Sequence, residues 1–173
     1  MTAKKMDISD KTKTLIEDLS NIEPDAVLLT ENRWEDIKAL IERGQKLSKL
    51  VGLIAADFSG DLRLSMSLIH GQVFNAVGEL SNQVKPSIID GASSRKLTFV
   101  KNRLFDFVDV MKRTSRRLND MAKRSSQDPM AFSGEVTTAL NVCADLASYL
   151  EFTGETISRR VKSQIGLLKE EGR

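Results

Sequence analysis

The single histidine of the chain, His70, lies in the stretch RLSMSLIHGQVFNAVGEL at residues 63–80. An imidazole titrates near neutral pH and can act as a general acid or base, and a guanidinium can hold a phosphate. Arg63 stands one heptad before His70, so both side chains fall on the same shoulder of a helix, beside its apolar stripe. These two residues are the catalytic candidates of the sequence.

A helical bundle with one histidine resembles the phosphotransfer modules of two-component systems, in which an imidazole carries a phosphoryl group. Those modules place Lys and Gly three and four residues after the histidine, and histidine-kinase dimerisation helices usually place an acidic residue after it. Here residues 71–74 read GQVF and match neither pattern. A histidine phosphocarrier is therefore one hypothesis for His70.

The six residues between Arg63 and His70 also resemble the spacing in the HEPN class of ribonucleases. That class usually has a polar residue directly after the arginine, whereas this chain has Leu64. The third interpretation is that His70 hydrogen-bonds to a neighbouring helix or to water and has no chemical role. The sequence favours this third interpretation.

Helices must position these residues, because apolar side chains recur at alternating spacings of three and four along most of the chain. Similar stripes predict helices over about 9–20, 30–58, 62–80, 94–125 and 136–168, with Thr30 and Asp61 as capping residues. Ser115 is a small residue in the stripe of the fourth helix. One apolar stripe runs along the second helix for three heptads through Ile37, Leu40, Gly44, Leu47, Val51, Ile54 and Phe58.

These patterns predict an all-α fold, and no alternating run of β-branched residues indicates a strand. We expect a single domain over residues 1–173, with a short N-terminal helix and its connector in 1–29 and four long helices in 30–171. The connectors between the long helices, such as SGD at 59–61 and KPSIIDGASS at 85–94, are short. Short connectors favour an elongated, mostly antiparallel bundle, with the first helix across one end or face.

The fourth helix carries the whole positive excess of the chain. Residues 93–126 contain ten Lys and Arg against three Asp, whereas the net formal charge of the chain is +2. On a helical wheel the basic residues form a ridge about 45 Å long away from the apolar stripe. A ridge of this kind could bind an acidic protein surface, the phosphates of a nucleic acid, an anionic membrane surface or the acidic outer faces of the flanking helices, or it could be a helix face that contacts only solvent. Its strongest candidates for partner binding are Arg113, Arg116, Arg117, Lys123 and Arg124.

The third helix has apolar residues on a second side. Leu64 and Leu68 project away from its stripe, with Gly71 and Gly78 nearby. Because a helix that is apolar on two sides is buried on two sides, we expect this face to be covered, by the first helix with residues 21–30 or by another subunit. The two glycines cost up to about 1 kcal/mol each against alanine, which favours a close approach there.

Several functional classes receive no support from the sequence. One cysteine, Cys143, excludes an internal disulfide, and one histidine disfavours a zinc site. No cofactor, metal or small-molecule substrate is inferred, and no run is long and apolar enough for a membrane span. The sequence predicts a cytoplasmic, non-enzymatic interaction module that acts as a regulator, adaptor or assembly subunit. Its expected partner is a protein, including a second copy of itself, and a nucleic acid is the alternative.

Overall fold

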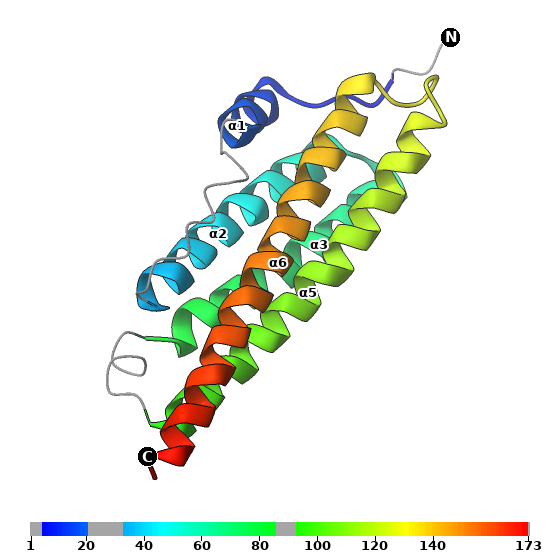
Figure 1. Ribbon diagram of the computed structural model, residues 1–173. Coiled ribbons are helices and arrows are strands. Elements are labelled where there is room, and N and C mark those ends of the chain that lie inside the picture. Colours follow the sequence, from blue (N-terminus) through cyan, green and yellow to red (C-terminus); the bar gives the residue numbers. More distant parts are fainter. Residues whose placement is uncertain (1–4, 21–32, 86–92, 173) are drawn as a thin grey trace.

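The computed structural model describes residues 5–20, 33–85 and 93–172, and every long element in these ranges is a helix. The four long helices run side by side in alternating directions, and the short first helix lies at one end (Figure 1). The predicted elongated, mostly antiparallel bundle is therefore confirmed. Thr30, the predicted capping residue of the second helix, lies outside the described residues. The helices are α1 (Asp10–Ser20), α2 (Arg33–Asp57), α3 (Gly60–Gln83), α5 (Ser94–Ser126) and α6 (Gly134–Glu170).

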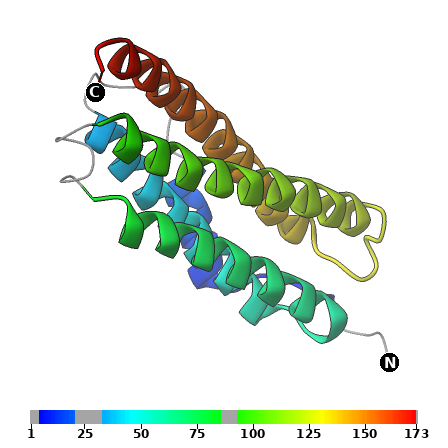
Figure 2. The same cartoon turned by 90° about the horizontal axis from the view of Figure 1, so that it is seen from below.

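The predicted stripes form the core of the bundle. Each long helix contacts the next along the chain, and α6 returns to contact α2, so the four helices close a ring (Figure 2). All seven residues of the second predicted stripe are buried, six of them in α2 and Phe58 directly after its end. Ser115 is buried as well, and its hydroxyl donates a hydrogen bond to the carbonyl of Ala144 on α6 at 3.3 Å. This small residue suits the close contact between α5 and α6, which pack together most extensively.

The centre of the core is the ring of Phe107. A Cβ atom built on Gly44 of α2 would lie 3.6 Å from its Cε2 atom, and one built on Gly154 of α6 would lie 3.7 Å from its Cδ1 atom. The ring from α5 thus fills the space that two glycines leave on the neighbouring helices. Three helices meet at this point.

The turn between α2 and α3 depends on Gly60. This residue has a φ of 61°, a left-handed conformation that glycine adopts without the steric cost of a Cβ atom. The N-cap residue is Ser59, whose side chain makes no capping hydrogen bond. The predicted capping residue, Asp61, lies instead in the first turn of the helix, where its charge favours the positive end of the helix dipole.

The N-terminal segment ties α2 to the connector between α5 and α6. The amide of Met6 donates to the carbonyl of Ala131 at 2.8 Å, and the amide of Ser133 donates to the carbonyl of Met6 at 2.9 Å. The Thr12 hydroxyl donates to a carboxylate oxygen of Asp57 at 2.7 Å. The first helix therefore lies against α2 and α6 at one end of the bundle.

This attachment is expected to depend on the charge of Asp7. The Ser133 hydroxyl and the Ile8 amide donate to the same carboxylate oxygen, each at 2.8 Å, and these bonds lower the pKa of Asp7 below its ordinary value of 3.8. A lowered carboxyl pKa stabilises the folded state above the unfolded pKa, and this stabilisation is lost as the pH falls through the folded pKa.

We expect the Met6 and Ser133 amide resonances in NMR spectra to shift as the pH falls below about 4, when the segment detaches. In Asp7→Asn the same resonances should keep one position across this range. A transition of equal size in the variant would contradict the role of Asp7.

Candidate interaction site between α3 and α5

The two surfaces that the sequence singled out meet along the line where α3 packs on α5, here called the seam. The C-terminal half of α5, which holds the basic cluster, lies beside the N-terminal half of α3, which holds the exposed leucines, because the two helices run in opposite directions (Figures 1 and 2). Ser93 fixes the start of α5, since its side chain accepts a hydrogen bond from the Lys96 amide at 3.2 Å. Lys123 and Arg124 lie in the last turn, where cations favour the negative end of the helix dipole.

The first of two hollows on the seam is the Leu68 hollow, with a volume of about 230 Å³. Its apolar part comes from Leu68 and Ile69 of α3 and from Met121 of α5. Arg117 and Arg124 border it, and the whole lining is Ser65, Leu68, Ile69, Arg117, Asp120, Met121 and Arg124. An apolar depression with two guanidinium groups at its edge can take an apolar side chain and carboxylates together.

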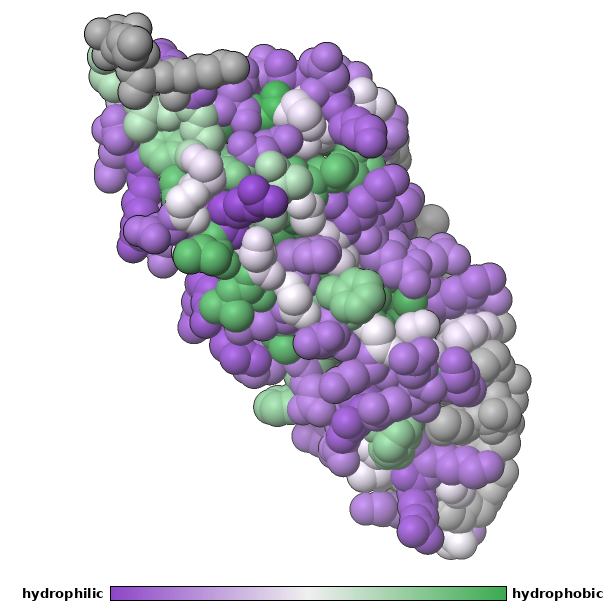
Figure 3. Space-filling model, turned by 180° about the vertical axis from the view of Figure 1, so that it is seen from behind, coloured by the Kyte–Doolittle hydropathy of each residue, from purple (hydrophilic) through white to green (hydrophobic). Residues whose placement is uncertain are grey.

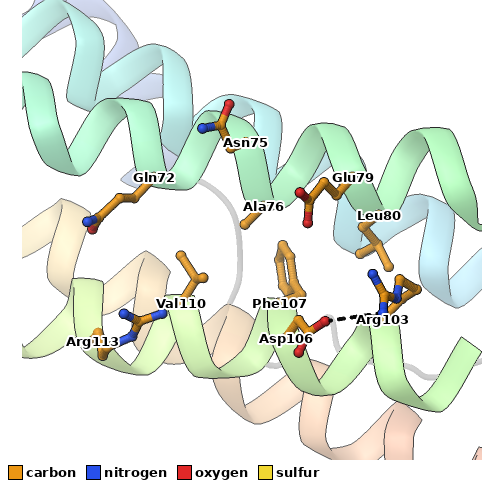
Figure 4. A pocket seen from close by; sticks show the side chains of 10 residues that line it. All are labelled: Gln72, Asn75, Ala76, Glu79, Leu80, Arg103, Asp106, Phe107, Val110 and Arg113. Carbon is orange, nitrogen blue, oxygen red and sulfur yellow. Dashed lines mark ion pairs between the residues drawn. The ribbon is translucent and has the colours of Figure 1, made fainter.

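The second is the Phe107 hollow, with a volume of about 220 Å³ (Figure 4). Ala76, Leu80, Phe107 and Val110 provide its apolar part, and polar side chains of both helices surround it. In Figure 4 the side chains of Gln72, Asn75 and Glu79 come from α3, and those of Arg103, Asp106 and Arg113 come from α5. This hollow carries both signs of charge.

Most of the charges at the Phe107 hollow already have partners. Arg103 lies 3.6 Å from a carboxylate oxygen of Asp106 and donates to the Gln83 amide oxygen at 3.2 Å. Arg113 lies 3.2 Å from a carboxylate oxygen of Asp109. The Leu68 hollow differs, because Arg124 forms no ion pair with any residue of the described ranges.

One hydrogen bond crosses the seam between the two hollows. The guanidinium of Arg117 donates to the side-chain oxygen of Gln72 at 3.0 Å. Arg117 lines the Leu68 hollow, and Gln72 lines the Phe107 hollow. Sequence reasoning did not select Gln72, although it stands four residues after Leu68 and thus on the same face of the helix.

The five basic candidates divide into two groups. Arg113, Arg117 and Arg124 line the hollows, whereas Arg116 and Lys123 are exposed on α5 and line neither of them. The predicted ridge is therefore two groups on one helix, and only one of them faces α3.

The second apolar side of α3 is open within the described part of the molecule. Leu64 is 70% exposed and Leu68 is 59% exposed. The expected cover by the first helix is wrong, because α1 lies against α2 and α6; residues 21–30 lie outside the described residues. Seen from the side of α3, apolar side chains gather in separate groups among hydrophilic ones (Figure 3).

The two glycines of α3 do not make the close approach that we expected within the chain. A Cβ atom added to Gly71 or Gly78 would have no atom of another described helix within 4 Å. The close approaches are made at Gly44 and Gly154, where an added Cβ atom would lie 2.7 Å from a methyl group of Val77 and Val108, respectively.

His70 lies half-buried between α2 and α3, as the shoulder position predicted. Its ring lies over Gly52, where an added Cβ atom would be 3.0 Å from Nε2 of His70. The centroids of the His70 and Phe74 rings are 6.2 Å apart. A groove of about 450 Å³ beside it is lined by Lys49 and Ser48 among others, but Arg63 does not line this groove. Within the described residues, Arg63 therefore does not share this groove with His70.

The remaining reactive groups offer no site. Burial raises the pKa of the Cys143 thiol well above its ordinary value, so this residue stays protonated in the core. Among the residues that the structure describes, no cluster of His, Cys, Asp and Glu is placed to hold a metal ion. None of the described helices is long and apolar enough to cross a membrane.

Comparison with protein-family models, with curated proteins and with solved structures finds no match for this chain.

Proposed function

We propose that the chain is a non-enzymatic interaction module, a regulator, adaptor or assembly subunit, that binds a partner protein on the seam of α3 and α5 and acts in the cytoplasm. The observation that carries the proposal is the Leu68 hollow, in which an exposed leucine stands beside Arg117 and Arg124. Buried apolar anchors with arginine around them are typical of protein–protein interfaces.

The surface chemistry of α3 supports the same conclusion. Residues 64–78 contain no Asp, Glu, Lys or Arg, although Leu64, Leu68 and Phe74 are more than half exposed. Four turns of uncharged, partly apolar surface are unusual for a helix that faces only water, and contiguous exposed apolar surface often marks an interaction site.

A nucleic acid is the second candidate partner. The observation that favours it is the second basic group on α5, since Lys112, Arg116 and Lys123 are exposed and form no ion pair with a described residue. Phosphates could bind there without any contact to α3.

The proposal is tested by photo-crosslinking from α3 in cells of the natural source. A benzophenone amino acid replaces Leu68 in one version of the full chain and Phe152 of α6 in the other. These two side chains are equally exposed, at 59% each, so random collisions label both alike. We expect a specific protein adduct from position 68 that does not form from position 152, where only the background of random collisions remains. Equal adducts from both positions, or none from position 68, would contradict an interface on the seam.

A further inference from the structure

We infer that the seam binds an acidic amphipathic helix of a partner protein, whose apolar side chains enter the two hollows and whose carboxylates pair with Arg117 and Arg124. This inference rests on the proposed function and gives the chemical class of the partner. It combines three observations: the positive charge around the Leu68 hollow, the distance between the two hollows, and the hydrogen bond from Arg117 to Gln72.

The positive charge around the Leu68 hollow favours a partner with a negatively charged surface. Residues 112–124 hold six Lys and Arg and a single acidic residue, Asp120, and the facing part of α3 is uncharged. Neither Arg117 nor Arg124 forms an ion pair with a residue in the described ranges. Complementary potentials set partner choice in protein complexes.

The same charge argues against a second copy of this chain and against a nucleic acid. A two-fold dimer places one patch against its own copy, so the basic residues of both copies would face each other. A phosphate backbone would neutralise the arginines but would leave Leu64 and Leu68, both more than half exposed, without an apolar partner. An amphipathic helix covers the leucines and supplies the carboxylates at once.

The spacing of the hollows defines the partner helix. Leu68 and Ala76 mark the two hollows on α3 and stand eight residues apart, about 12 Å by helical rise. Met121 and Val110 mark them on α5 and stand eleven residues apart, about 16 Å. The partner therefore carries its two apolar anchors eight or eleven residues apart, the spacings in this range that keep both anchors on or near one face of a helix, with acidic residues beside the anchor that enters the Leu68 hollow.

The hydrogen bond of Arg117 to Gln72 gives binding a local mechanism. An arginine bonded to a neutral amide gains a stronger, charge-assisted bond when a carboxylate replaces the amide. As Arg117 turns to the incoming carboxylate, its bond to Gln72 breaks. The two hollows then form one continuous groove along the seam.

The test uses the full chain and two fluorescently labelled synthetic helices of about 20 residues. The acidic peptide has two leucines eleven residues apart, glutamates flanking one of them and alanine elsewhere; the basic peptide has lysine in place of each glutamate. Fluorescence anisotropy measures binding at low and high salt. We expect the acidic peptide to bind, more weakly at high salt, and the basic peptide not to bind. Equal binding of both peptides would overturn the acidic class of the partner.

Two double variants locate the binding site on α5. Arg117→Glu with Arg124→Glu reverses the charges of the Leu68 hollow and is expected to weaken binding of the acidic peptide at least about tenfold. Lys112→Glu with Arg116→Glu makes the same charge change at exposed positions outside both hollows, and we expect its effect to stay within about threefold. Circular dichroism checks that both variants fold. Equal losses in both variants would overturn binding on the seam.

The inference and the proposed function fail in different ways. Adducts at position 68 without binding of the acidic peptide would overturn the partner class and leave the interface. A labelled single-stranded oligonucleotide is the third probe. If it binds in place of the acidic peptide, and both double variants weaken it equally, the partner is a nucleic acid and both conclusions fall. If neither adducts nor peptide binding are found, both are overturned.

Discussion

Replacing Phe107 by alanine is expected to lower the free energy of unfolding by about 3–5 kcal/mol. The ring is 1% exposed and lies where α2, α5 and α6 meet. The cost has two parts, the lost transfer of the ring from water and the cavity that remains. The cavity cannot close easily, because Gly44 and Gly154 have no side chains that could move into it.

Phe105 provides the matched control for this substitution. It is the same residue type on the same helix, two positions earlier, and it is 68% exposed. We expect Phe105→Ala to change the free energy of unfolding by less than about 0.5 kcal/mol. Urea denaturation followed by circular dichroism measures both variants, and equal slopes with denaturant ensure that the comparison reflects stability alone. A loss below about 1 kcal/mol in Phe107→Ala would contradict its central place in the core.

The sequence was sufficient to predict the bundle because helical periodicity records which side of each helix is buried. The stripe residues of α2 are all buried, and those of α6 are buried up to Ile165. Val77 stands one heptad after His70 and so falls on the same shoulder of α3, yet it is 4% exposed, because α3 contacts both α2 and α5 and buries a wider face than one stripe. Periodicity gives the direction of a side chain on its own helix and not the width of the contact.

The candidate site was predicted as two separate surfaces. Leu68 and Arg117 lie 49 positions apart, on helices whose relative register the sequence does not encode in any local pattern. The direction of the helices was expected from the short connectors, but it does not specify which turn of α3 faces which turn of α5. That register is set by side-chain packing across the bundle, and it brings Leu68, Arg117 and Arg124 to one hollow.

Within the described residues of the chain, the close approach expected at two glycines is found at two other glycines, for a related reason. A close approach was predicted at Gly71 and Gly78 because they stand outside the stripe of α3, where a glycine has no role in the core. Gly44 stands in the apolar stripe of the second helix, Gly154 is flanked at spacings of four and three by the apolar Leu150 and Ile157, and these two glycines make the close approaches. A glycine allows two helices to approach only if a neighbouring side chain stands opposite it. Val77 and Val108 supply that side chain at Gly44 and Gly154, whereas a Cβ atom at Gly71 or Gly78 would have no atom of another described helix within 4 Å.

Replacing Gly154 by leucine is expected to lower the free energy of unfolding by about 3 kcal/mol, the upper end of the usual cost of overpacking a core. A Cβ atom alone would lie 2.7 Å from Cγ2 of Val108 on α5, closer than unstrained carbon atoms come, and the rest of the leucine would have to enter space near Phe107 and Leu40. Val108 is short and β-branched, so it has little rotamer freedom to move aside within a helix. Helix α6 must therefore move away from α5 and open the most extensive contact of the bundle.

Gly166→Leu separates this packing effect from the effect of removing a glycine. Gly166 is on the same helix, is exposed, and would meet nothing within 4 Å with an added Cβ atom. Leucine favours helix more than glycine does, so we expect this control to leave the protein unchanged or up to about 0.8 kcal/mol more stable. Thermal and urea denaturation of the two variants measure the difference. Equal stability of Gly154→Leu and Gly166→Leu would contradict the contact between α5 and α6 at Val108. The position of α5 in the bundle, and with it the register between α5 and α3, would then be different.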